Sequence, residues 1–234
     1  MHPLILSFLA GMATFAGALI SVIIGGRSEK VLGFSLGLSG GMMLFVSFAE
    51  LIPKSSEALG NTAILLTMSL GCLAYSLFEI LSGDSDKFTR LGRVSAAALA
   101  LHNFPEGIVT FLSGNTPFGY KLALTVGLHN VPEGLSVAMP LLAGKSPFTK
   151  KEKIKKALLT SLYSGLAEPF AAMVTFLFFP NAASSAPILP YLFSFIAGMM
   201  SSVSLGELIP SAAGYGFYGH AGMIAGVAMG ALTR

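Results

Sequence analysis

Eight apolar stretches follow one another along the chain, each long enough to cross a lipid bilayer as a helix of about 20 residues. They span residues 3–25, 31–53, 61–81, 94–113, 119–143, 155–179, 188–211 and 216–233. Hydrophobic residues make up 53% of the 234 residues and charged residues only 11%, far from a soluble globular composition. The stretches are continuous and do not alternate with polar residues, which favours helices over strands. The sequence therefore predicts an all-α, polytopic membrane protein with a single transmembrane domain over residues 1–234.

Basic residues are unequally distributed between the two sides that these helices would define. Three alternate connections hold eleven of the 14 Lys and Arg residues: Arg27 and Lys30; Lys87, Arg90 and Arg93; and Lys145, Lys150, Lys151, Lys153, Lys155 and Lys156. The opposite side holds Lys54, Lys121 and Arg234. Because basic residues are enriched in cytoplasmic loops, we expect the segment 145–156 in the cytoplasm and both termini outside it. The same rule accounts for the formal net charge of +3, so no nucleic-acid partner is inferred.

An internal repeat indicates an inverted architecture. Residues 41–53 (GMMLFVSFAELIP) and 198–210 (GMMSSVSLGELIP) match at nine of thirteen positions. They fall in the second and seventh predicted helices, an odd number of crossings apart, so they would run through the bilayer in opposite directions. Secondary transporters are often built from inverted repeats, with the substrate bound near the midplane where the repeats meet. Such symmetry also occurs in channels, and duplication can produce it in any membrane protein.

Glycines recur at every fourth position in two of the predicted helices. These rows are Gly33, Gly37 and Gly41 in the second helix, and Gly222, Gly226 and Gly230 in the eighth. Small residues at this spacing allow two helix backbones to approach closely. We therefore interpret both rows as packing surfaces, with a sliding or gating surface as the alternative.

A second repeat carries charged residues into the apolar runs. His102–Gly107 reads HNFPEG and His129–Gly134 reads HNVPEG, so the strings match at five of six positions and lie 27 residues apart. A charged side chain in hydrocarbon costs about 2.5 to 3.5 kcal/mol on insertion scales. Placing His and Glu twice at this depth therefore requires a compensating interaction, and a metal ion inside the membrane would provide it.

The spacing within each string brings possible ligands together. His102 and Glu106 are four residues apart and share one face of a helix, which Asn103 borders. The second string repeats this arrangement on the next helix. Imidazole nitrogen and carboxylate oxygen suit Zn²⁺ and other divalent first-row ions, and the amide oxygen of Asn tolerates Mn²⁺ and Fe²⁺. Cys72 is the only cysteine, so a thiolate cluster is excluded.

A third glutamate completes the candidate site, because Glu168 precedes Pro169 in the middle of the sixth predicted helix. Three ionised carboxylates carry a charge of −3, so one divalent ion leaves −1 and two leave +1. Charge counting thus permits one metal or two, with Glu106 and Glu133 as bridges, and predicts weaker binding at low pH. The candidate metal ligands are His102, Asn103, Glu106, His129, Asn130, Glu133 and Glu168.

Simpler interpretations apply to single residues of these patterns. One His–Glu pair alone would be a buried polar contact between helices, but two pairs of identical spacing beside Glu168 favour a metal site. Glu50 and Glu207, in the repeated ELIP strings, lie near helix ends and are interpreted as interfacial or capping residues that could guide ions at an entrance. Met42 and Met43 offer thioethers, but methionine is a frequent core filler.

The two HNxPEG strings, the SGLAEP string at residues 164–169 and the eight-helix layout resemble the ZIP divalent-metal transporters, most closely their bacterial zinc-uptake permease branch. The resemblance covers nearly the whole chain. It implies a 3+2+3 helix arrangement with inverted repeats, uptake into the cytoplasm, and a binuclear site between the fourth, fifth and sixth helices. One metal would take His102, Glu106, His129 and Glu133, and the other Asn103, Glu106, Asn130, Glu133 and Glu168. A methionine of the second helix, Met42 or Met43, would add to the first metal.

We therefore predict a multi-pass carrier of the cell membrane, the inner membrane in a bacterium, that takes up divalent cations. Zn²⁺ is the expected substrate, with Fe²⁺, Mn²⁺, Co²⁺ and Cd²⁺ as further ones. A metal-selective channel would use the same ligands without an alternating cycle. An intramembrane metalloenzyme is disfavoured because the HExxH order is missing. We expect no catalytic residues, no organic cofactor, and metal ions and the lipid bilayer as partners; the family resemblance is compatible with a homodimer.

Overall fold

The computed structural model describes residues 2–24, 28–81, 87–114, 117–144, 147–178 and 187–233, and in these ranges all regular structure is helical. The elements are α1 (Pro3–Ile24), α2 (Glu29–Phe45), η1 (Val46–Leu51), α3 (Ile52–Ser56), α4 (Asn61–Leu81), α5 (Lys87–Ser113), α6 (Pro117–Ala143), α7 (Lys150–Phe178), α8 (Leu189–Val203), η3 (Ser204–Leu208), α9 (Ile209–Ala213) and α10 (Phe217–Thr233). The prediction of an all-α protein is confirmed for this part of the chain.

Several of these helices are long and apolar enough to span a membrane. α2, η1 and α3 are continuous over Glu29–Ser56, and α8, η3 and α9 are continuous over Leu189–Ala213. Both of these rods meet the length and hydropathy expected of a membrane span, as do α1 and α7. Each of α4 and α10 includes a shorter apolar helical stretch. These helices agree with the prediction of a multi-pass membrane protein. That all eight predicted segments cross the bilayer stays a prediction.

The helix bounds agree with the predicted segments except where polar residues extend a helix. α7 begins at Lys150, five residues before the predicted 155, and α5 begins at Lys87 instead of 94. At the start of α7, the backbone N–H of Thr149 donates to Glu152 Oε2 at 2.7 Å, and the N–H of Glu152 donates to Thr149 Oγ1 at 3.3 Å. This capping box satisfies N–H groups that the first turn leaves without helical partners. A search for apolar runs does not detect such a polar first turn.

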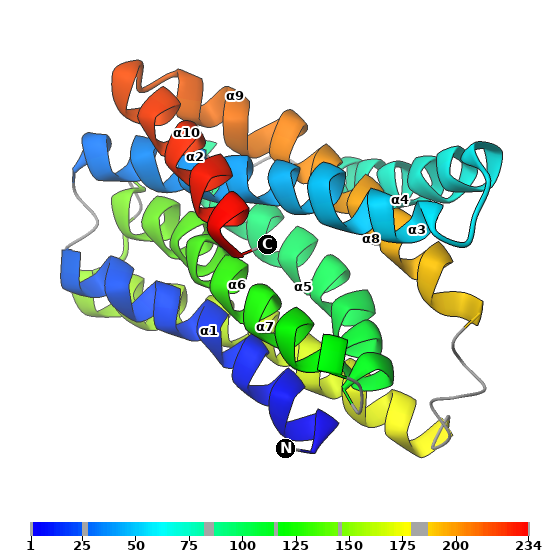
Figure 1. Ribbon diagram of the computed structural model, residues 1–234. Coiled ribbons are helices and arrows are strands. Elements are labelled where there is room, and N and C mark those ends of the chain that lie inside the picture. The colour runs from blue at the N-terminus through cyan, green and yellow to red at the C-terminus, as the bar shows by residue number, and fades with distance from the viewer. Residues whose placement is uncertain are drawn as a thin grey trace.

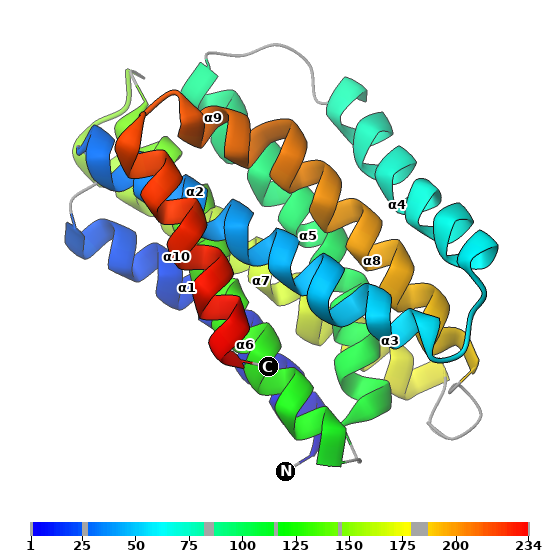
Figure 2. The same ribbon diagram turned by 45° about the horizontal axis from the view of Figure 1, so that its top comes forward.

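The helices form two groups (Figures 1 and 2). In the first group, α1 packs along α6 and α7, and α5 packs along α6 and α7. In the second group, α2 packs along α10, and α4 packs along α8 at the edge of the molecule (Figure 2). Contacts between the groups are fewer and run mainly between α2 and α6 and between α5 and α8. We call these the α1–α5–α6–α7 group and the α2–α4–α8–α10 group.

Glycines explain the close packing inside the second group. A Cβ on Gly37 or Gly41 of α2 would collide with backbone carbonyl oxygens of α10. A Cβ on Gly222 or Gly226 of α10 would collide with backbone carbonyl oxygens of α2. Only glycine leaves room for two backbones at this distance, so the interpretation of both rows as packing surfaces is confirmed.

The repeated ELIP strings adopt the same local structure. Both form a short π-helix, η1 and η3, followed by an α-helix with a proline in its first turn, Pro53 in α3 and Pro210 in α9. The two rods are antiparallel: Ser55 Oγ, near the end of one, donates to the carbonyl of Pro190 near the start of the other at 2.8 Å, and Ser204 Oγ donates to the carbonyl of Gly40 at 2.7 Å. The two strings therefore run in opposite directions, as predicted. The full 3+2+3 relation stays a prediction.

Candidate metal centre

All the candidate ligands lie on three helices of the α1–α5–α6–α7 group, and all are buried. The first HNxPEG string lies in α5 and the second in α6, and both helices continue through the prolines of the strings. Glu168 lies in α7 and is fully buried. The seven residues are His102, Asn103, Glu106, His129, Asn130, Glu133 and Glu168, with exposed fractions between 0% and 4%. The structure thus brings together the residues that the sequence singled out.

The two strings exchange partners across the α5–α6 interface. His102 Nε2 lies 3.3 Å from Glu133 Oε1, and His129 Nε2 lies 3.4 Å from Glu106 Oε1. Each imidazole therefore contacts the carboxylate of the other helix, although the spacing predicted only that His and Glu of the same string share a face. The first contact satisfies hydrogen-bond geometry. Neither string forms this arrangement by itself.

The two asparagines connect α6 and α5 to the neighbouring helices. Asn130 Nδ2 donates to Glu168 Oε2 at 3.0 Å and to the carbonyl of Ala10 in α1 at 2.9 Å. Asn103 Nδ2 donates to the carbonyl of Ser164 in α7 at 3.2 Å. An Asn side chain has two donors on nitrogen and an acceptor oxygen. Because the amide nitrogens already donate to protein groups, the amide oxygens are the atoms that each asparagine can still offer to a metal ion.

Glycine at the last position of each string allows the neighbouring helix to reach the site. A Cβ on Gly107 would collide with the carbonyl oxygen of Glu168, and a Cβ on Gly134 would collide with that of Thr14. The close approach of α7 at Gly107 places Glu168 beside α5 and α6. These glycines are thus part of the architecture of the site, a role that the sequence pattern did not assign.

Each of the seven residues keeps at least one buried nitrogen or oxygen atom with no hydrogen-bond partner among the described residues. These atoms are His102 Nδ1, Asn103 Oδ1, Glu106 Oε2, both ring nitrogens of His129, Asn130 Oδ1, Glu133 Oε2 and Glu168 Oε1. A buried polar atom without a partner costs roughly 1–3 kcal/mol, so a cluster of eight is expensive unless a ligand satisfies it. All of them can bear a lone pair, as a cation requires.

The side chains do not have the arrangement of a closed metal site. In the ranges that the structure describes, no group of three or more His, Cys, Asp or Glu side chains is positioned, in this conformation, to hold a metal ion. The imidazoles and carboxylates contact each other across α5 and α6 instead. Chemically, the cluster offers imidazole nitrogen, carboxylate oxygen and amide oxygen, which together suit divalent first-row cations.

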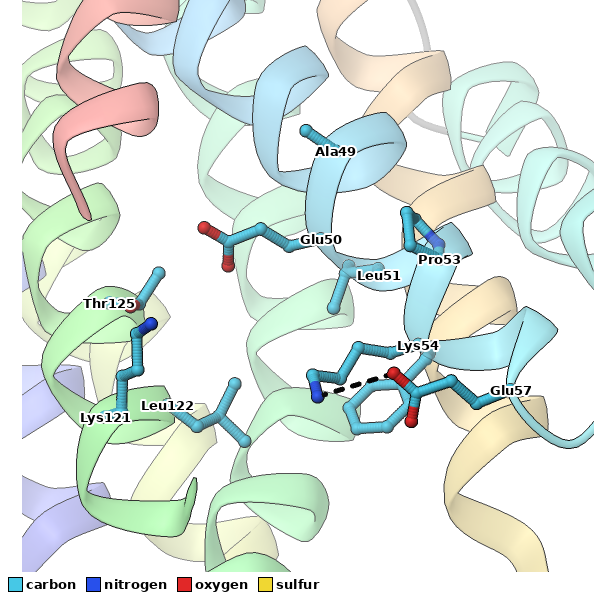
Figure 3. A pocket seen from close by; sticks show the side chains of 10 residues that line it. Ala49, Glu50, Leu51, Pro53, Lys54, Glu57, Lys121, Leu122 and Thr125 are labelled. Carbon is cyan, nitrogen blue, oxygen red and sulfur yellow. Dashed lines mark ion pairs between the residues drawn. The ribbon is translucent and has the colours of Figure 1, made fainter. Parts of the chain in front are cut away.

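The sequence pattern did not reveal the cavities that lead toward this cluster. An outer cavity of about 340 Å³ lies between η1, α3 and the first turns of α6, with Glu50, Lys54, Glu57 and Lys121 in its lining (Figure 3). A smaller cavity of about 20 Å³ shares Glu50 with it and also touches Glu106 and His129. Glu50 therefore lies between the outer cavity and the candidate metal centre, which agrees with a role at an entrance.

The other residues considered from the sequence lie outside this cluster. Met42 and Met43 are buried in an apolar cluster with Val46 and Met200, and Ser39 Oγ lies 4.0 Å from the Met43 sulfur. They fill the core, as interpreted, and ligation by either stays a prediction. Glu207 lies in η3, in the other copy of the ELIP string.

Apolar helices long enough to span a membrane, gathered around buried His, Asn and Glu side chains, are what we expect of a membrane protein that binds or moves ions. Comparison with known sequences makes this class specific. Residues 88–233, more than half of the chain, match the family model of the ZIP zinc transporter. The chain belongs to the ZIP zinc transporter family.

Curated relatives align over nearly the whole chain. The zinc transporter ZupT of Chlorobium chlorochromatii is 34% identical over 260 aligned positions, which cover 97% of this chain and 94% of the relative. ZupT of Akkermansia muciniphila is 35% identical, with 98% and 95% covered, and ZupT of Salmonella arizonae is 33% identical, with 90% and 86% covered. The predicted family, its bacterial zinc-uptake branch and a transporter instead of an enzyme are confirmed.

Proposed function

We propose that this protein carries Zn²⁺ across the membrane into the cytoplasm through the cluster on α5, α6 and α7. The observation that carries the proposal is the reciprocal pairing of two histidines with two glutamates, beside Glu168, in a fully buried position. Charged groups at this depth are expensive unless they serve an ion. The relatives named above are zinc transporters, which supports Zn²⁺ as the cargo.

Two adjacent ions would be held by this cluster. Glu106 and Glu133 would bridge them, since each carboxylate has a second oxygen without a hydrogen-bond partner among the described residues. The first ion would bind the two histidines and the second the two asparagines and Glu168. The 3.0 Å contact between Asn130 and Glu168 supports the second set, because it holds these two side chains together. Binding requires the histidines to turn from the opposite glutamates toward the ion.

Transport would expose this cluster to the two sides of the membrane in turn. All seven ligands belong to the α1–α5–α6–α7 group, so movement of this group against the other would carry the whole site. The boundary contains Met42, Met43, Met139 and Met200 in one apolar cluster. Methionine is flexible and adapts to changed packing, which suits a boundary that must re-form. A channel with the same ligands is the alternative.

The same donors would accept other divalent ions. Imidazole, carboxylate and amide ligands without thiolates suit Fe²⁺, Mn²⁺, Co²⁺ and Cd²⁺ as further substrates. For uptake, the outer cavity must face away from the cytoplasm, and the distribution of basic residues predicts this orientation and both termini on that side. The setting would be the inner membrane of a bacterium, and a homodimer is compatible with this arrangement.

Uptake of radioactive Zn²⁺ into liposomes that contain the purified protein tests the proposal. Glu133→Ala should abolish saturable uptake, because it removes a bridging carboxylate and the partner of His102. Glu29→Gln, an exposed change at the first turn of α2, is the matched control and should transport as the wild type does. Equal uptake by wild type and Glu133→Ala would refute the proposal. Competition by Fe²⁺ and Mn²⁺ would rank the other ions.

A further inference from the structure

The outer cavity is unusual for a route that admits divalent cations, because its lining carries as many positive as negative groups. Glu50 and Glu57 contribute two carboxylates, and Lys54 and Lys121 contribute two ammonium groups. Figure 3 shows these side chains around the same space, with Lys54 paired to Glu57 at 3.8 Å. A cavity lined by one sign of charge concentrates the opposite ion, whereas this lining has a formal charge of zero.

Lys121 lies on the side of α6 that leads toward the candidate metal centre. Lys121, Thr125 and His129 follow each other at intervals of four residues, so each lies one turn beyond the last on the same side of α6. Thr125 lines both cavities, and His129 lines the inner one. Eight residues of helix separate Lys121 from His129, a rise of about 12 Å. This face of α6 thus leads from the outer cavity to the metal ligands.

The inner cavity is small. Its volume is about 20 Å³, and much of its lining is apolar, including Val46, Val126 and Ile196. A hydrated ion therefore meets the charged groups of the outer cavity before it reaches the inner cavity. Its concentration in the outer cavity depends on each of these charges and on the distance of each from the ion, and a divalent ion responds twice as strongly as a monovalent one.

On the basis of the proposed function, we propose that Lys121 determines how readily divalent cations enter the outer cavity. Its ammonium group opposes the attraction that Glu50 exerts on an incoming ion. This keeps capture of the ion weaker than two carboxylates alone would make it. Lys121 acts on the ion through the electric field and does not bind it. The residue therefore affects the concentration needed for uptake and leaves the later transport step unchanged.

Lys121→Gln removes the positive charge and keeps most of the side-chain length. For a divalent ion about 9 Å from a unit charge in water, Coulomb's law gives about a fivefold change in local concentration. We expect about a fivefold lower Zn²⁺ concentration at half-maximal uptake at low ionic strength, with an unchanged maximal rate. The shift should disappear at high ionic strength, because salt screens charges in a solvated cavity. Lys121→Arg keeps the charge and should match the wild type.

Lys54→Gln is the matched control, because it changes the lining by the same charge in the same cavity. Lys54 contacts the exposed Glu57 and lies on α3, whereas Lys121, which is also exposed, lies on α6 two turns before His129. We expect less than half of the shift seen with Lys121→Gln. An equal shift in both variants would overturn the assignment to Lys121, as would no shift in Lys121→Gln, a shift that persists at high salt, or the same shift in Lys121→Arg.

The outcomes separate this inference from the proposed function. If wild-type uptake is lost in Glu133→Ala but Lys121→Gln behaves as the wild type, only the role of Lys121 fails. If the wild type takes up no Zn²⁺, or Glu133→Ala takes it up normally, the proposed function fails and the role of Lys121 fails with it. Each variant is first checked for the elution profile of the wild-type protein, so that misfolded material does not enter the comparison.

Discussion

His102 and His129 each contact a glutamate of the opposite helix, so the chemistry of this site belongs to pairs of residues. The sequence repeat predicts which residues take part, because charged groups at the same spacing in two apolar helices are costly unless they act together. It does not predict the exchange of partners, since that depends on how α5 and α6 are rotated about their axes. Helix rotation results from packing against α1 and α7, and residue spacing within one string contains no information about it.

A double-mutant cycle tests the exchange of partners. Changing His102 and Glu133 to Ala, singly and together, should give a coupling free energy of about 1–3 kcal/mol in metal-free protein, because each single change leaves a buried polar group alone. The same cycle for His102 and Glu106, on one helix, should give a clearly smaller value. The measurement is the free energy of unfolding in detergent. A larger coupling within one helix would contradict the observed pairs.

The ligands also predict the effect of pH on zinc binding. Carboxylates and imidazoles bind a metal in their deprotonated forms, so protons and Zn²⁺ compete for the same atoms. We expect the affinity for Zn²⁺ to fall as the pH is lowered over the range in which the protein stays folded, and binding to release protons. Titration calorimetry in buffers of different ionisation enthalpy measures both quantities. An affinity that is constant over this range, without proton release, would contradict the proposed ligands.

At the scale of helices, much of the arrangement could be predicted from the sequence and some could not. Apolar length predicts the helices, because the bilayer requires it. The polar first turn of α7 was missed, because the Thr149–Glu152 capping box lies outside the apolar run. The spacing of Lys121, Thr125, His129 and Glu133 is visible in the sequence. It indicates a path to the metal ligands only once a cavity is known to lie beside these residues. The outer cavity was not predictable, since α3 and α6 form it from distant parts of the chain.

Gly107 offers a test of how helix contact positions a ligand. Gly107→Ala places a Cβ against the carbonyl oxygen of Glu168, so α7 must shift. We expect a loss of about 1–3 kcal/mol in unfolding free energy, typical of overpacking, and weaker Zn²⁺ binding as Glu168 moves away. Gly127→Ala is the control, because its new Cβ would lie 3.7 Å from Ala10 Cα, an ordinary contact. Comparable losses of unfolding free energy and of Zn²⁺ binding in both variants would indicate a general effect of a Gly→Ala change, and would contradict the specific role of Gly107.

For the whole molecule, the division into two helix groups has a mechanical consequence. Glycines bring backbones together within each group, as between Gly37 and Gly219 or between Gly11 and Gly165. Apolar side chains, including Met42 and Met139, occupy the core cluster between the groups. Backbone contacts through glycine are stiff, because no side chain can rearrange to absorb a shift, whereas methionine adapts. Under the proposed function, we therefore expect relative movement to occur at this boundary.

Movement of one group that carries the whole site predicts the kinetics of a carrier. Liposomes preloaded with unlabelled Zn²⁺ should take up radioactive Zn²⁺ faster than empty liposomes. The reason is that a site loaded with internal Zn²⁺ returns to the outer side faster than an empty site does. Uptake should also saturate as the few binding sites fill. With the membrane potential held at zero by valinomycin and equal K⁺ on both sides, a channel with the same ligands would conduct in both directions at once, so internal Zn²⁺ would not accelerate entry of the label. Glu133→Ala liposomes measure the leak. Acceleration in the wild type and its absence in Glu133→Ala would therefore establish a carrier, and an unaccelerated, unsaturable flux would establish a channel.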